Sequence, residues 1–158
     1  MAKGDVIFKE NDEYYTPLWV VRKTAGYPDF DPATTELKAK EFGVEHYATK
    51  EIDGLYGAWF NYKNIWINPP FTLKKEFVKK AVKTVIDYKN TKVFILLPIE
   101  TLTTNWFYDL NISYNIYMPR GRIKFENPLN PKAKSPAFGS VIVEFGYNAS
   151  NKIINITE

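Results

Sequence analysis

The sequence contains no cysteine and only one histidine, His46, among its 158 residues. The absence of thiols excludes disulfide bonds, thiolate metal sites and a cysteine nucleophile. A lone histidine also excludes a metal centre built from several imidazoles, so no metal site is predicted and His46 is interpreted as structural. No apolar run approaches membrane-spanning length, and the polar N-terminus lacks the apolar core of a signal peptide. We therefore expect a soluble intracellular protein.

The residues that are present are typical of one folded domain. The chain is 45% hydrophobic and 25% charged, and its length is enough to bury a core without disulfides or metals. Residues 1–13 are polar and charged, so we expect a flexible N-terminal arm followed by a single domain over residues 14–158. The net charge of +3 permits nucleic acid as a partner without requiring it.

Hydrophobic periodicity predicts alternating strands and helices. Helices are predicted directly after Pro17, over residues 33–43 with Leu37 and Phe42 inward, over 72–90 with an apolar stripe from Leu73 to Ile86, and over 103–111. Strands are predicted over residues 27–32, 64–68, 92–98, 114–119, 122–126 and 140–146. Residues 45–60 indicate a loop with short pieces of structure.

This order predicts an α/β domain whose central sheet is mostly parallel and ends in an antiparallel hairpin. The last two strands of that hairpin are separated by a loop rich in proline and lysine, residues 127–139. Ligands of such sheets bind beyond the carboxyl ends of the strands. Asp31, Asn68 and Glu100 each lie at or just beyond the end of a predicted strand, so we expect them to meet at one edge.

The tetrapeptide Asn68-Pro69-Pro70-Phe71 follows a buried-type strand and precedes a helix. Prolines donate no amide hydrogens, so the turn presents carbonyl acceptors, and the Asn68 side chain adds another. Two acceptors next to an aromatic ring suit an exocyclic amine on a base, whose lone pair they aim at an electrophile. The alternative is a plain strand stop in which Asn68 caps a turn.

Beyond these four residues, a series of segments resembles one family. "YYTP", "DFDPATTELKA", "EIDGL", "WINPPF", "FILLPIETLTTNWF" and "GRIKF" occur in the order typical of phage-type DNA N-6-adenine methyltransferases, the Dam-like amino-methyltransferases. The resemblance covers residues 14–145. It implies a Rossmann-like class I methyltransferase fold, S-adenosylmethionine as cofactor, and methylation of adenine N6 in DNA by a single minimal methyltransferase domain.

The resemblance also implies roles for individual residues. The Asn68 side chain and the Pro69 carbonyl would hold the amine, Pro70 would complete the turn, and Phe71 would stack on the base. The implied cofactor-binding residues are Tyr15, Thr16, Pro17, Asp31 and Asp53. Tyr15 as a core residue, Asp31 as a helix cap and Asp53 as half of an Asp-Gly turn are the structural alternatives.

The sequence differs from the related enzymes at two points, one that concerns cofactor binding and one that concerns stacking on the base. Larger adenine methyltransferases carry a glycine-rich F-x-G-x-G after the first strand, whereas this chain has no G-x-G and places "DPATT" there. Phe71 stands where tyrosine is commoner, which keeps the stacking surface and loses a hydroxyl group.

Duplex DNA with a flipped adenine is the expected partner. Its phosphates would be contacted by Arg120, Arg122, Lys124, Lys132 and Lys134. Alternatively, the lysines form an ordinary solvated face and an arginine pairs with a carboxylate near the site. Base specificity would come from residues 100–115 and 126–139. We expect a monomer or weak homodimer in the cytoplasm, which is the host's if a phage encodes the chain.

Two other kinds of function fit the same sequence. The first is an amino-methyltransferase acting on another amine, such as cytosine N4, an RNA base or a protein amide. The hydrogen-bond acceptors of the turn suit the N–H donors of each of these groups. The second is a catalytically silent nucleic-acid-binding module, which the absence of G-x-G favours.

Overall fold

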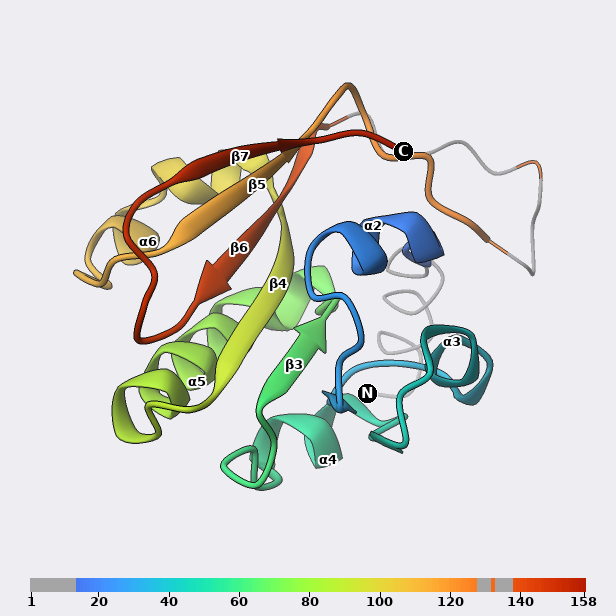
Figure 1. Ribbon diagram of the computed structural model, residues 1–158, viewed down its shortest axis with the longest axis horizontal. Coiled ribbons are helices and arrows are strands. Elements are labelled where there is room, and N and C mark those ends of the chain that lie inside the picture. Colours follow the sequence, from blue (N-terminus) through green and yellow to red (C-terminus); the bar gives the residue numbers. More distant parts are fainter. Residues whose placement is uncertain (1–13, 128–131, 133–137) are drawn as a thin grey trace.

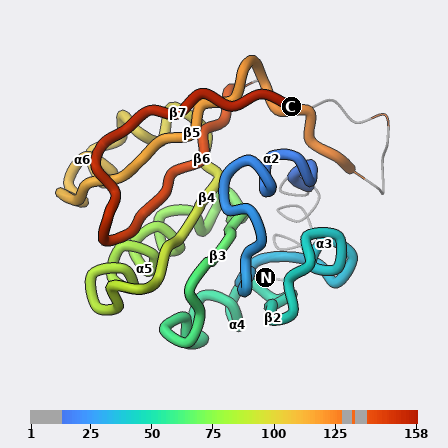
Figure 2. The backbone as a smooth tube through the Cα atoms, in the orientation of Figure 1, coloured from blue at the N-terminus to red at the C-terminus, as the bar shows by residue number. Residues whose placement is uncertain are grey.

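The computed structural model describes residues 14–127, 132 and 138–158. Within them the strands form one sheet in the order β2-β1-β3-β4-β6-β5-β7 (Figure 1). The strands are β1 (Phe30–Asp31), β2 (His46–Tyr47), β3 (Asn64–Ile67), β4 (Lys92–Pro98), β5 (Asn115–Pro119), β6 (Ser140–Phe145) and β7 (Ile153–Ile156). Figure 2 shows β2 at the opposite end of this sheet from β7.

The direction of the strands confirms the α/β prediction. The pairs β1–β2, β1–β3, β3–β4 and β5–β7 are parallel, whereas β6 is antiparallel to both of its neighbours, β4 and β5. A mostly parallel sheet with one antiparallel part fits the predicted Rossmann-like methyltransferase fold.

Helices cover both faces of the sheet. The α-helices are α2 (Leu18–Lys23), α3 (Glu36–Phe42), α4 (Glu51–Tyr56), α5 (Lys74–Asp87) and α6 (Asn105–Tyr108), and the 3-10 helices are η1 (Phe71–Leu73) and η2 (Ile99–Thr103). One core cluster joins α4, α5 and α6 to the sheet, and the other joins α2 and α3 to its opposite face. Strand β4 is apolar on both faces and therefore needs cover on both. Val93, Ile95 and Leu97 belong to the first cluster, while Phe94 and Leu96 belong to the second.

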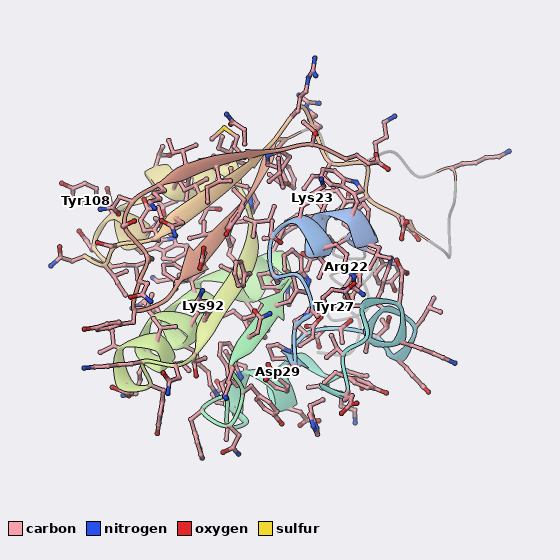
Figure 3. All side chains as sticks on the ribbon, viewed as in Figure 1. Arg22, Lys23, Tyr27, Asp29, Lys92 and Tyr108 are labelled. Carbon is pink, nitrogen blue, oxygen red and sulfur yellow. The ribbon has the colours of Figure 1, made fainter. Side chains whose placement is uncertain are left out.

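Local sequence explains where the helices begin and end. The Thr35 hydroxyl accepts a hydrogen bond from the Lys38 amide at the start of α3, and Gly43 ends the helix with a left-handed φ of 76°. Arg22 then ties α2 to this end of α3, since its guanidinium donates to the Phe42 carbonyl (2.9 Å) and lies over the Tyr27 ring (Figure 3).

Several predicted elements differ from the structure. Residues 122–126 do not form a strand: apart from a bridge between Glu126 and Tyr15, this segment lies outside the sheet, so it makes no hairpin with β6. The antiparallel partners of β6 are β4 and β5 instead. Strand β7 was not predicted at all, whereas residues 45–60 contain the short elements β2 and α4, in keeping with the predicted loop with short pieces of structure.

Two side chains predicted to face inward are exposed. Leu37 of α3 and Ile86 of α5 are each 62% exposed, whereas Phe77, Val78, Ala81, Val82 and Val85 of the predicted stripe are buried. The predicted arm, residues 1–13, lies outside the described residues. Within the described part of the chain, no helix combines the length and apolar character needed to cross a bilayer.

Candidate functional site

The carboxyl ends of three adjacent parallel strands meet at one edge of the sheet. Strands β1, β3 and β4 end at Asp31, Ile67 and Pro98, so Asn68 directly follows the middle strand. A cleft with a cavity of about 160 Å³ opens beside β1 and β3. Its lining includes the N-terminal segment Tyr14–Thr16, the Asp31 loop and the Asn68 turn. The sheet therefore brings together most of the predicted site, as expected for a fold of this kind.

The Asn68 side chain has a defined orientation. Its Nδ2 donates a hydrogen bond of 2.7 Å to the main-chain carbonyl oxygen of Tyr14. A carbonyl oxygen only accepts, so the atom facing it must be the amide nitrogen. The acceptor Oδ1 is therefore directed away from Tyr14.

The two prolines contribute different carbonyls to the turn. The Pro70 carbonyl accepts a hydrogen bond of 3.0 Å from the Leu73 amide, at the beginning of η1. Pro69 and Pro70 themselves have no amide hydrogen to donate. The Pro70 oxygen is thus used inside η1, and of the predicted acceptors Asn68 lines the cavity, whereas Pro69 is buried and lies outside the lining.

Aromatic rings surround Phe71. Its ring centroid lies 6.1 Å from that of Tyr14 and 5.3 Å from that of Phe138, and Tyr14 in turn lies 5.9 Å from Phe125. Phe125 and Phe138 flank the two ends of the proline- and lysine-rich loop. The ring of the predicted stacking residue thus contacts one end of that loop directly, through Phe138, and the other end only by way of Tyr14.

Asp31 is almost completely buried at the end of β1 and lines the cleft. Burial raises the pKa of its carboxyl group to about 7, although hydrogen bonds from the Ala33 amide (3.0 Å) and the Thr34 side chain act in the opposite direction. The bond from Ala33 makes Asp31 the cap of the following turn, so its structural role is real. Its place in the cleft adds a buried group that changes charge near neutral pH.

Two other polar atoms of the cleft lack a hydrogen-bond partner in the described residues. Thr16 Oγ1 and Trp66 Nε1 are both buried and unpaired, and both residues line the cavity. An unpaired buried polar group costs about 1–3 kcal/mol, so both atoms would gain from a hydrogen bond with a group bound in the cleft. A hydroxyl, an indole N–H and a carboxyl group together suit a polar cofactor with donors and acceptors of its own.

The other predicted cofactor residues lie at different distances from the cleft. Tyr15 and Thr16 line it, whereas Pro17 is buried and lies outside the lining. Asp53 is exposed on α4 and also lies outside the lining, and the acidic residue of α4 that does line the cleft is Glu51. His46, interpreted as structural, is exposed in β2 with its ring 5.5 Å from that of Tyr62.

Gly54 explains how α4 approaches the cleft. A Cβ atom at this position would lie 1.6 Å from the Pro32 carbonyl oxygen, next to Asp31. Only glycine allows this approach. The "IDGL" segment therefore contributes a close backbone contact behind the Asp31 loop.

Lys38 is a site residue that the sequence did not reveal. Only 4% of it is exposed, it lines the cleft, and its ammonium group donates to the Thr16 carbonyl (3.2 Å), to Glu41 (3.1 Å) and to Glu126. A lysine three residues before a glutamate on a helix resembles an ordinary surface ion pair. The sequence carries no signal that this lysine is buried.

The predicted phosphate contacts lie on the exposed segment that leads to Glu126. Arg120, Arg122 and Lys124 are exposed, as is Lys132, whereas Lys134 lies outside the described residues. Among the residues that the structure describes, none of these four side chains forms an ion pair, so the predicted alternative of an arginine–carboxylate pair is not seen. Glu126 pairs with Tyr15 through two main-chain hydrogen bonds of 2.9 Å, which places this segment beside the cleft.

Residues 100–115, which were predicted to contribute to base specificity, lie at two opposite edges of the sheet. Helix η2 follows the carboxyl end of β4, on the same edge as Asn68. Residues 109–114 instead precede β5, which runs in the same direction as β4, and they therefore lie at the opposite edge. Of residues 100–115, only the first part is near the cleft.

Comparison with known proteins identifies a family. The model of the family described as DNA N-6-adenine-methyltransferase (Dam) matches residues 4–155. A protein named DNA N-6-adenine-methyltransferase from Haemophilus phage HP1 (strain HP1c1) is 28% identical over 134 residues, which cover 80% of this chain and 73% of that protein. A protein of the same name from Escherichia phage T1 is 32% identical over 82 residues, covering 52% of this chain and 32% of its own length. These matches confirm the family resemblance read from the sequence motifs.

Proposed function

Because the chain belongs to the DNA N-6-adenine-methyltransferase (Dam) family, we propose that it methylates N6 of adenine in DNA with S-adenosylmethionine as methyl donor. The observation that carries the proposal is the orientation of Asn68, whose nitrogen is bound by the Tyr14 carbonyl. This orientation presents an acceptor, as a substrate with N–H donors requires.

The exocyclic amine of adenine has two N–H donors and a lone pair that is delocalised into the ring. The Asn68 Oδ1 atom and the Pro69 carbonyl would accept those two hydrogens and draw the nitrogen towards tetrahedral geometry. The lone pair would then point at an electrophile, and the proton would leave after attack. Positioning and electrostatics supply the catalysis, without a strong general base.

The cleft suits the proposed cofactor without a glycine-rich loop. Thr16 Oγ1, Trp66 Nε1 and the Asp31 carboxyl group are the polar atoms that would hold it, with Tyr15 as part of the wall. Glu51 lines the cleft where the motif predicted Asp53, and we assign the acidic contact of α4 to Glu51. When bound, S-adenosylmethionine supplies an electrophilic methyl group.

DNA would approach the edge that carries Asn68. The target base would leave the duplex and stack on Phe71. Arg120, Arg122, Lys124 and Lys132 are exposed and free of ion pairs among the described residues, so they are available to phosphates. The basic segment reaches the cleft through the pairing of Glu126 with Tyr15.

Methyl transfer from labelled cofactor tests the proposal. We expect N6-methyladenine in digests of a duplex that contains adenine, and no label in a duplex made only of G·C pairs. Label in the G·C duplex, in RNA or in protein would assign the site to another amine. Failure of the protein to bind the cofactor in a calorimetric titration would instead indicate a silent nucleic-acid-binding module.

The role of the turn has its own test. Asn68→Ala removes the acceptor, and we expect transfer to fall by about 10²–10³-fold while cofactor affinity is largely kept. Asn64→Ala is a control for losing a buried amide at the other end of β3, where Asn64 binds the Ala25 carbonyl. Transfer by Asn68→Ala at the wild-type rate would contradict the assigned role.

A further inference from the structure

The orientation of Asn68 depends on a segment far away in the sequence. The acceptor of its amide is the main-chain carbonyl of Tyr14, fifty-four residues earlier. Tyr14 precedes α2 and belongs to no named strand, so strand pairing within the sheet does not fix the carbonyl that orients Asn68. The contacts that hold Tyr14 in place therefore also set the direction of the Asn68 Oδ1 atom, the acceptor of the proposed catalytic turn.

Contacts with Glu126 and with Lys38 help to hold the segment Tyr14–Thr16. Its backbone pairs with Glu126 through two main-chain hydrogen bonds of 2.9 Å at Tyr15. From the other side, the Lys38 ammonium group donates to the Thr16 carbonyl (3.2 Å) and to the Glu126 carboxylate. Lys38 thus bridges the two strands of this small pairing.

The ammonium group of Lys38 has no spare donor. Its three N–H groups match three acceptors, the Thr16 carbonyl and the carboxylates of Glu41 and Glu126. Burying a charged lysine is costly unless it is paired in this way. A shift of Thr16 or Glu126 would therefore leave one N–H group of this buried charge without an acceptor.

We propose that Lys38 is a positioning residue for Asn68. It fixes Thr16 and Glu126, these fix the Tyr14 carbonyl, and that carbonyl fixes the amide of Asn68. The kinetic part of this inference rests on the proposed function, whereas the structural link between Lys38 and Asn68 does not.

The link is tested by nuclear magnetic resonance on the ¹⁵N-labelled protein. The Asn68 side-chain NH₂ pair is assigned by its loss in Asn68→Ala. We expect Lys38→Met to move or broaden this pair, because the Tyr14 carbonyl is released. Lys40→Met, an exposed lysine on the same helix, is the matched control and should leave the pair unchanged.

Glu126→Gln provides a second variant that does not depend on a buried substitution. The side chain of Glu126 is half exposed, and its pairing with Tyr15 uses only main-chain atoms. We expect a smaller change of the Asn68 NH₂ pair in the same direction. If Lys38→Met does not fold, Glu126→Gln decides the question alone. An Asn68 pair that is unchanged in every folded variant overturns the proposal.

Kinetics then separate positioning from binding. We expect Lys38→Met to lower kcat for methyl transfer by about 10–100-fold, as small misplacements of a catalytic group do. The KM for DNA should change much less, because Lys38 is buried beneath the surface. A higher KM with an unchanged kcat would overturn the positioning role. Absence of transfer by the wild-type protein would defeat the proposed function, while the resonance of Asn68 would still decide the link.

Discussion

At the residue scale, the Tyr14 carbonyl requires a donor at position 68. Asparagine supplies one at every pH, whereas a carboxyl group donates only when it is protonated. We therefore expect Asn68→Asp to be at least about tenfold less active than the wild type near pH 8. Its activity relative to the wild type should rise as the pH is lowered towards about 6. Parallel measurements of rate against pH for the two proteins check this.

This prediction is decided by how the ratio of variant to wild-type rates changes with pH, and not by the absolute rate of either protein. A ratio of variant to wild-type rates that stays constant across the pH range would show that no donor is required. Such a result would remove the Tyr14 carbonyl from the proposed mechanism. Melting temperatures of both proteins at each pH control for loss of folded protein.

Asp31 gives the stability of the protein a dependence on pH. Since burial raises its pKa to about 7, the folded state keeps a proton that the unfolded chain loses near pH 4. The contribution to stability is complete below about pH 4 and is lost as the pH rises through about 7, on the order of 4 kcal/mol in all. We expect the fall in unfolding free energy over this range to be smaller in Asp31→Asn.

Denaturant titrations at several pH values measure this effect. Asp53→Asn is the matched control, because Asp53 is an exposed aspartate on the neighbouring helix α4. The control should keep the pH dependence of the wild type. An identical curve for Asp31→Asn would show that Asp31 is ionised throughout the range.

Sequence patterns predicted the polar turn but missed the residues that support it. Asn68, Asp31 and Thr16 could be predicted because they follow strands or belong to motifs. Lys38 and the Tyr14 carbonyl could not, since one resembles a surface lysine and the other is a main-chain atom. Leu37 was predicted to be inward, yet α3 buries Lys38, Ala39 and Phe42 instead. The face of α3 that is buried thus includes a lysine with three acceptors and leaves Leu37 exposed.

At the element scale, the position of α4 depends on Gly54. A Cβ atom there would overlap the Pro32 carbonyl oxygen, and a backbone atom cannot rotate away as a side chain can. We expect Gly54→Ala to lower the unfolding free energy by about 3 kcal/mol or more. Gly139→Ala is the control, because its Cβ would meet only Ile99 at 3.7 Å. Equal stabilities of the two variants would mean that α4 can move away at little cost.

The strands and helices with a strong pattern were predicted correctly. Strand β4 is an unbroken apolar run and is buried on both faces, and α5 follows its apolar stripe. Residues 122–126 were wrongly predicted to form a strand, because Ile123 and Phe125 alternate with charged residues. Ile123 does enter the core with α2 and α3, but only Glu126 of this segment pairs with another strand-like segment. An alternation of apolar and charged residues indicates which side chains are buried, but it does not show that the backbone pairs with a strand.

At the scale of the whole molecule, three exposed basic side chains lie on the segment that leads to Glu126, which pairs with Tyr15 of the cleft. If the segment Arg120–Lys124 contacts phosphates, Arg122→Ala should weaken binding to all DNA sequences alike. The slope of log affinity against log salt should fall by about one. Lys83→Ala is the control, because Lys83 pairs with Asp87 on α5. Fluorescence titrations at several salt concentrations measure both slopes, and equal slopes for Arg122→Ala and the wild type would place the DNA elsewhere.

The position of β6 has a consequence for how the chain folds during its synthesis. Strands β4 and β5 are not neighbours in the sheet, because β6 separates them and pairs with both. Val141, Val143 and Phe145 of β6 are fully buried, so both open edges stay unsatisfied until this strand emerges from the ribosome. The cleft-bearing strands are all made earlier. The nascent chain therefore contains the strands that border the cleft before β6 joins β4 to β5 and before β7 completes the sheet.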